Sequence, residues 1–207
     1  MNVTDKERFL EITKHLCSDT FPSVYLNDLL EAGAFAQYPF SMLPAMRNTP
    51  QSPTHHPEGN VWNHTCLVVD EAAQLRKKSQ NPTAFMWAAL LHDIGKPGTT
   101  RKRRGRITSY DHEKLGMDLA VEFLAALTDD QALIQRVATL IRYHMQPLFV
   151  IKDLPFAEVE AMKREIDVRE IALLGYCDRM GRTNSDAKAE GVHMRQFLKK
   201  CGVNELR

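Results

Sequence analysis

Residues 85–96 read FMWAALLHDIGK, an apolar run that ends in a histidine, an aspartate and a lysine. Every position from Phe85 to Leu91 is apolar, so we expect a helix that other helices surround on all sides. Asn81 followed by Pro82 is a typical start for such a helix, which we expect to end near Gly95. An imidazole and a carboxylate at its buried end need partners, because burying an unpaired carboxylate is costly.

Helical signals on both sides of this stretch predict an all-α bundle. A capping-box pattern at Thr4 starts one helix, and a second such pattern at Thr128 starts another. Residues 37–59 contain five prolines and are expected to form a packed, irregular arm. Residues 99–110 surround Gly105 and are expected to form a small basic hairpin or loop. The remaining helices are expected at about 23–32, 60–78, 110–127, 128–144, 156–165, 167–180 and 186–201, with a connection between Pro147 and Pro155.

The composition is that of an ordinary globular domain without a strong charge. The chain has 207 residues, with 27 Lys and Arg against 26 Asp and Glu, so global charge points neither to nucleic acid nor to a membrane. No apolar stretch approaches the roughly 20 residues that cross a bilayer. The four cysteines form no CxxC pair, and the first residues do not resemble a signal peptide. We therefore expect a single-domain cytoplasmic protein with reduced thiols.

Imidazoles and carboxylates recur at the ends of helices or inside apolar helical stretches. Successive members lie roughly one helix plus one connection apart, so a bundle can bring them to a common point. A single buried histidine is more often a hydrogen-bonded core residue than a ligand. Several such groups together favour a shared cation, which removes the cost of burying all of them. Imidazole with carboxylate suits manganese, iron, cobalt, nickel or zinc. The candidates are His64, His92, Asp93, His112, His144 and Asp178.

These residues carry a resemblance to a known family. His64, the His92-Asp93 pair and Asp178 resemble the His…His-Asp…Asp signature of the HD-domain superfamily of metal-dependent phosphohydrolases. HHPEGNVWNHT (55–65), ALLHDIGKPGTT (89–100), SYDHEKLG (109–116) and CDRMGR (177–182) resemble the HD region of bacterial CCA-adding tRNA nucleotidyltransferases. The likeness covers roughly residues 25–185. The Gly-Ser start and Asp-x-Asp pair of their polymerase half do not occur upstream of Ser23, so we expect a free-standing HD module.

The resemblance implies a domain layout and a set of ligands. The HD core would cover 60–182, preceded by N-terminal helices and the Pro-rich arm (1–59) and followed by a C-terminal helix (183–207). His64, His92, Asp93 and Asp178 would bind a first divalent ion. His112 and His144 match the extra histidines of two-metal HD proteins. By this resemblance, Asp93 of this chain would bridge the two ions.

Further candidates lie around this set. Lys96 is close to one helical turn after Asp93 and is expected to offset charge on a phosphoryl group, although a lysine complementing a helix dipole is the simpler reading. Arg179 and Arg182 are expected either to bind a second substrate phosphate or to form structural salt bridges. Glu58, next to His56, is expected to close the site mouth or to cap a helix. Glu113 is a candidate partner of His112. The basic run Arg101, Lys102, Arg103, Arg104 and Arg106 is either a solvated hairpin or a contact for RNA phosphates.

Three functions fit these residues. The first is a metal-dependent phosphohydrolase, either a phosphomonoesterase or a 2′,3′-cyclic phosphodiesterase, that acts on a nucleotide or a small phosphate ester through metal-activated water. In this reading Asp93 and Lys96 are the catalytic residues. The second is a mixed-valent diiron oxygenase, which the same ligand set serves in some HD proteins. The third is a non-catalytic module that binds nucleotide or RNA.

Overall fold

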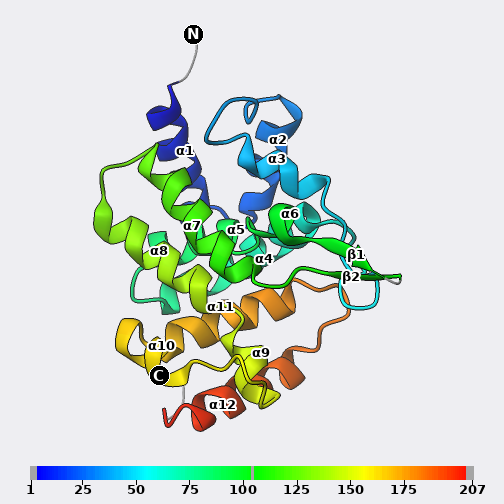
Figure 1. The fold of residues 1–207 in the computed structure, drawn as a ribbon. Coiled ribbons are helices and arrows are strands. Elements are labelled where there is room, and N and C mark those ends of the chain that lie inside the picture. The colour runs from blue at the N-terminus through cyan, green and yellow to red at the C-terminus, as the bar shows by residue number, and fades with distance from the viewer. Residues whose placement is uncertain (1–3, 104, 204–207) are drawn as a thin grey trace.

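The computed structural model describes residues 4–103 and 105–203, and Figure 1 shows that most of this part of the chain is helical, with loops and one small two-stranded hairpin between the helices. The predicted all-α fold class is confirmed. The elements, in chain order, are α1 (Asp5–Ser18), α2 (Pro22–Glu31), α3 (Met42–Arg47), α4 (Val61–Leu75), the 3-10 turn η1 (Arg76–Lys78), α5 (Pro82–Leu91), α6 (Lys96–Thr99), β1 (Arg101–Arg103), β2 (Arg106–Thr108), α7 (His112–Ala125), α8 (Gln131–Tyr143), α9 (Gln146–Ile151), α10 (Val159–Glu165), α11 (Val168–Met180) and α12 (Ala187–Lys200).

Helix α5 is the centre of the core, as its uniform apolarity predicts. Its side chains from Ala84 to Leu91 are completely buried, and α1, α4, α8 and α11 pack around it. The Asn81 side chain accepts a hydrogen bond from the Ala84 amide at 3.0 Å and caps the helix. The indole of Trp87 donates to the Thr13 hydroxyl, which satisfies its polar atom inside the core.

The helix ends at Leu91 rather than near Gly95, which corrects the expected boundary. A turn then carries His92 and Asp93, and α6 begins at Lys96. This turn packs directly against α7. A Cβ atom on Gly95 would overlap with the His112 carbonyl oxygen and lie 2.7 Å from the Gly116 amide nitrogen. Glycine is therefore required here for space, and the close approach brings α7 to the end of α5.

Other departures from the expected elements have local causes. Asp130, not Thr128, caps α8, because its carboxylate accepts from the Leu133 amide. The expected connection between Pro147 and Pro155 contains α9, since a proline in the first turn of a helix removes no helical hydrogen bond.

The Pro-rich arm packs against the core as expected, but it contains the short helix α3. Phe40, Leu43 and Met46 are fully buried, whereas Tyr38 is exposed. The arm ends in an isolated antiparallel bridge between Pro50 and Asn60. Its last residues therefore return to the start of α4, beside the end of α5.

The basic segment, expected to be either a hairpin or a loop, forms a hairpin. Strands β1 and β2 pair antiparallel with Lys102 opposite Ile107, and Gly105 takes a left-handed conformation (φ 76°) in the turn. Arg101 and Lys102 are exposed, and Arg104 lies outside the described residues. Within the described ranges, no helix is both long and apolar enough to cross a membrane.

Candidate metal centre

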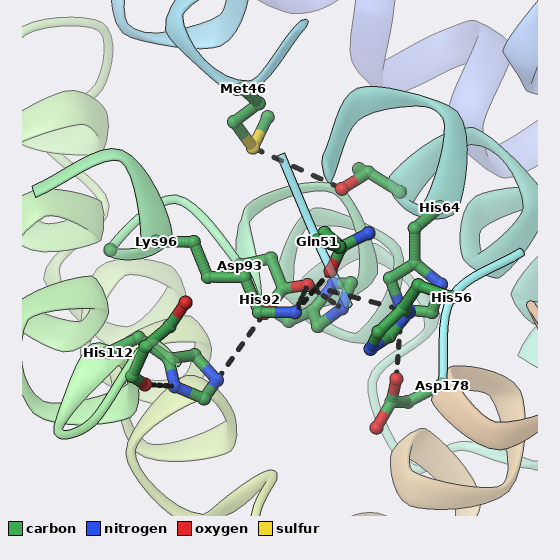
Figure 2. A network of polar contacts seen from close by, with 12 residues as sticks. Met46, Gln51, His56, His64, His92, Asp93, Lys96, His112 and Asp178 are labelled. Carbon is green, nitrogen blue, oxygen red and sulfur yellow. Dashed lines mark hydrogen bonds and ion pairs between the residues drawn. The ribbon is translucent and has the colours of Figure 1, made fainter. Parts of the chain in front are cut away.

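The residues expected to bind metal meet at one place, although they come from distant segments. Figure 2 labels His64, His92, Asp93, His112 and Asp178 among them. Each belongs to α4, α7 or α11, or directly follows α5 or α8. All are at least nine-tenths buried. Their exposed fractions are 0% for His64, 1% for His92 and Asp93, 6% for His112, 2% for His144 and 9% for Asp178. The bundle thus brings together side chains that are separated by up to 114 positions in sequence.

Asp93 lies at the middle of this cluster, and its two carboxylate oxygens face different histidines. Oδ2 lies 3.3 Å from His92 Nε2 and 3.9 Å from His64 Nε2. Oδ1 lies 3.4 Å from His112 Nε2 and 4.0 Å from His144 Nε2. Asp178 adds its Oδ1 atom 2.9 Å from His64 Nε2, on the first side. The carboxylate of Asp93 therefore stands between two separate groups of potential ligands.

The protonation of three histidine rings follows from their contacts with backbone carbonyl groups. Nδ1 of His92, His112 and His144 lies 2.9, 2.7 and 2.7 Å from the carbonyl oxygens of Ala89, Ser109 and Ile141, respectively. A carbonyl oxygen only accepts hydrogen bonds, so each Nδ1 carries the hydrogen and donates it. In the neutral ring the lone pair is then on Nε2, the atom that faces Asp93.

These lone pairs are a chemical reason to place cations in the cluster. Nε2 of His112 and Nε2 of His144 are only 3.2 Å apart, and both lie near Asp93 Oδ1. Nε2 of His92 is buried and has no hydrogen-bond partner among the described residues. Lone pairs and carboxylate oxygens at such distances repel one another unless a cation lies between them. The donor set of imidazole nitrogens and carboxylate oxygens fits a divalent transition metal.

The charges of the cluster support the same interpretation. Burial alone would raise the pKa of Asp93, but the electrostatic interactions with His92 and Lys96 hold it well below its usual range. Burial, together with His112 and His92, lowers the pKa of His144 to about 3. At neutral pH the cluster therefore combines an ionised carboxylate with a neutral imidazole, the forms in which both residues bind metals.

His64 is held between two carboxylates. Its Nε2 faces Asp178, and its Nδ1 lies 2.9 Å from Glu58 Oε1. Burial disfavours its charged form, but Asp178 and Glu58 together raise its pKa. Glu58 also accepts from His56 Nδ1 at 2.8 Å. A carboxylate beside the outer nitrogen of a histidine can orient the ring. Glu58 lies at the right distance for this, although the angle at His64 Nδ1 is not that of a hydrogen bond.

Glu58 was also a candidate for binding substrate, but it lies behind His64 and away from the cavity that leads to the cluster. Its side chain is only 2% exposed and does not line the cavity described below. Its carboxylate lies against the rings of His56 and His64 instead. The neighbouring His56 does reach the cavity wall.

The remaining candidates take different positions around the cluster. The Arg179 guanidinium makes two hydrogen bonds to Glu190, at 3.0 and 3.1 Å, as a structural salt bridge does. Arg182 lies 4.0 Å from Asp178 Oδ1 and lines the cavity. Glu113 is 5% exposed and lies beside His112, so it is a buried neighbour of the cluster.

Lys96 is next to the cluster, as its spacing from Asp93 predicts. Its ammonium nitrogen lies 2.7 Å from Asp93 Oδ2. It also donates to the side-chain oxygen of Gln51 at 2.7 Å, a contact to the Pro-rich arm that Figure 2 displays. Gln51 is a residue that the sequence analysis missed. No spacing or motif links positions 51 and 96, because only the packing of the arm brings them together.

A cavity of about 1160 Å³ leads from the cluster to the surface. Asp93, Lys96, His112, His144 and Asp178 line its inner end, so these side chains are accessible from it. The outer part has an apolar wall made of Ile107, Tyr110, Leu148, Phe149, Pro155 and Phe156. This volume is somewhat larger than the usual range for small-molecule sites, which run from about 300 to 1,000 Å³.

Comparison of the sequence with known proteins gives one family match and several relatives. The HD domain family model matches residues 61–180. The multifunctional CCA protein of Actinobacillus pleuropneumoniae (serotype 5b, strain L20) is 41% identical over 101 residues, which are 49% of this chain and 24% of the relative. The multifunctional CCA protein of Halorhodospira halophila is 33% identical over 138 residues (65% and 31%). That of Mannheimia succiniciproducens is 27% identical over 192 residues (88% and 45%). The chain thus spans less than half the length of these relatives.

Proposed function

Because this chain belongs to the HD domain family, most of whose members are metal-dependent hydrolases, we propose that it is a metal-dependent phosphohydrolase. The observation that carries this proposal is the position of Asp93, whose two oxygens face two separate groups of imidazole nitrogens. His64, His92, Asp93 and Asp178 would hold one ion. Asp93, His112 and His144 would hold a second, with Asp93 as the bridge. The metal would be manganese, nickel, cobalt, zinc or iron.

Several side chains of the chain would bind the phosphate or orient the metal ligands around these ions. Divalent ions supply Lewis-acid activation of water and of a phosphoryl group. Lys96 lies at the inner end of the cavity, where its ammonium group can donate to a phosphoryl oxygen as negative charge builds up on it. Arg182, which also lines the cavity, would supply a second cation for a phosphate. The buried histidines hold their Nε2 atoms in place through hydrogen bonds to the backbone.

The apolar outer wall favours a nucleotide over a small phosphate ester as the substrate. Phe156 and Tyr110 remain 59% and 76% exposed, and both line the cavity, so their rings are accessible to a ligand. The Phe149 ring packs edge-on against Phe156 with the ring centres 5.6 Å apart, so Phe156 has a fixed neighbour. A planar base stacked on this wall would place its phosphate toward the metal cluster.

The basic hairpin supports RNA as a related partner. Ile107 and Thr108 of β2 line the cavity, and the exposed Arg101 and Lys102 belong to the paired strand β1. Phosphates on either side of a bound nucleotide would meet these charges. We therefore propose that the substrate can also be RNA, which carries the same base and phosphate groups as a nucleotide. A non-catalytic RNA-binding role is the competing function.

Removal of the metal tests the proposed activity. Protein treated with a chelator is expected to release no phosphate from adenosine monophosphates, 2′,3′-cyclic AMP or glycerol phosphate. Reloading with manganese, nickel, cobalt or zinc is expected to restore turnover, in air and without oxygen alike. Phosphate release and metal content are measured on the same samples. Turnover that needs both iron and oxygen would indicate the oxygenase instead. RNA binding without turnover by the fully loaded protein would indicate the non-catalytic module.

The aromatic wall gives a prediction about substrate preference. In Phe156→Ala, KM for an adenosine monophosphate is expected to rise by about tenfold, because stacking of a base on an aromatic ring is worth about 1–3 kcal/mol. KM for glycerol phosphate, which has no base, should stay within about twofold. Phe21→Ala is the matched control, since Phe21 is 58% exposed and does not line the cavity. Equal losses for both substrates in Phe156→Ala would contradict a base-binding wall.

A further inference from the structure

The Pro-rich arm contributes a side chain to the metal centre. Gln51 lies just after the last buried segment of the arm and is 6% exposed. Its side-chain oxygen accepts a hydrogen bond of 2.7 Å from the Lys96 ammonium group. The same ammonium lies 2.7 Å from Asp93 Oδ2. Lys96 therefore stands between a carboxylate of the cluster and a neutral amide from a segment 45 positions earlier in the chain.

The orientation of the Gln51 amide is determined by the backbone around it. Its Nε2 atom donates to the Asn60 carbonyl oxygen at 3.2 Å, and a carbonyl can only accept. The bridge between Pro50 and Asn60 holds the two ends of this loop together, and the Val61 amide donates to the Thr49 carbonyl oxygen at 3.1 Å. The amide oxygen is thus directed toward Lys96.

A lysine side chain needs such a contact to hold one position. Its four-carbon stem has many rotamers, and the ammonium group is a compact charge with three donors. Asp93 Oδ2 and the Gln51 side-chain oxygen each lie 2.7 Å from the ammonium, and Lys96 lines the cavity, so a further N–H donor of the ammonium can face a substrate. Because the Gln51 amide is neutral, it positions the ammonium without cancelling its charge.

We propose that Gln51 is a positioning residue, which acts through Lys96 on the phosphoryl group of the substrate. This inference rests on the proposed function only in that Lys96 contacts a phosphate. Among the described residues, the Gln51 side chain hydrogen-bonds to Lys96 and to the Asn60 carbonyl oxygen, and to none of the residues that would bind metal. Removal of its amide oxygen leaves Lys96 with the Asp93 carboxylate as its acceptor, so the ammonium shifts toward Asp93 and away from the phosphate position.

A double-mutant cycle separates this role from a purely structural one. Affinity for inorganic phosphate is measured by calorimetry on metal-loaded wild type, Gln51→Met, Lys96→Met and the double variant. Gln51→Met is expected to weaken phosphate binding about tenfold, the usual size of a charge-assisted contact that is lost. In the Lys96→Met background the same replacement should have no further effect. Metal content of Gln51→Met should equal that of the wild type.

The outcomes of this cycle are distinguishable. If Gln51→Met weakens phosphate binding equally with and without Lys96, or changes only the melting temperature, then Gln51 only stabilises the packing of the Pro-rich arm. In that case the inference is wrong. If the wild type binds no phosphate, the role of Lys96 and the inference both fail. If it binds phosphate but hydrolyses no ester, the proposed function fails, while the cycle still decides the role of Gln51. Gln51→Ala gives the same comparison should Gln51→Met unfold.

Discussion

Asp93→Asn is expected to lose its bound metal and to lower the rate of phosphate release by about a thousandfold or more. The replacement has the same shape, but the amide nitrogen replaces one carboxylate oxygen and donates hydrogen bonds instead of binding a cation. Both groups of histidines face this one carboxylate, so the change affects both proposed ions. A thousandfold lower rate corresponds to a loss of several kcal/mol of transition-state stabilisation, because each tenfold change in rate corresponds to about 1.4 kcal/mol.

The measurement combines elemental analysis of the purified variant with the phosphate-release assay. Asp118→Asn is the matched control, because Asp118 is an exposed carboxylate on α7. The control should keep its metal and its turnover. Metal-free Asp93→Asn is expected to melt below the metal-free wild type, because the surroundings of Asp93 favour its charged form and the buried Lys96 ammonium loses the carboxylate 2.7 Å away. Full metal content with unchanged turnover in Asp93→Asn would refute the bridging role.

Gly95→Ala is expected to destabilise the fold by about 3 kcal/mol, which lowers the melting temperature by about 6–12 °C for a chain of this size. The added Cβ would meet the His112 carbonyl oxygen and the Gly116 amide nitrogen. Both are backbone atoms and cannot rotate away, so α7 must move away from the turn after α5. His112 moves with α7, and metal binding on its side of Asp93 should weaken as well.

Gly191→Ala controls for the general effect of adding a methyl group. Gly191 lies in α12, where the added Cβ would meet only the end of the Arg195 side chain at 3.5 Å. Alanine is the better helix former, so this variant should be as stable as the wild type or slightly more stable. Thermal unfolding followed by circular dichroism measures both variants. Similar melting temperatures for Gly95→Ala and the wild type would contradict the close packing at Gly95.

Much of the candidate site could be predicted because its residues stand in recognisable local patterns. Imidazoles and carboxylates at the ends of apolar helices predicted a cluster, and the structure brings those side chains together. Their roles as ligands stay a prediction, as does the single-domain layout. Gln51 could not be found in this way. It lies in an irregular arm, and its partner Lys96 is selected by packing alone.

The amino-acid sequence by itself determined the fold class, the central position of α5 and the set of residues that meet beyond its end. Helical periodicity and apolar burial are local properties, and each segment carries them regardless of its neighbours. Only the tertiary structure decided that α5 stops at Leu91, that Glu58 turns to His64, and that Arg179 pairs with Glu190. These contacts depend on how closely two segments approach each other, and that distance is a property of the packed molecule rather than of either segment.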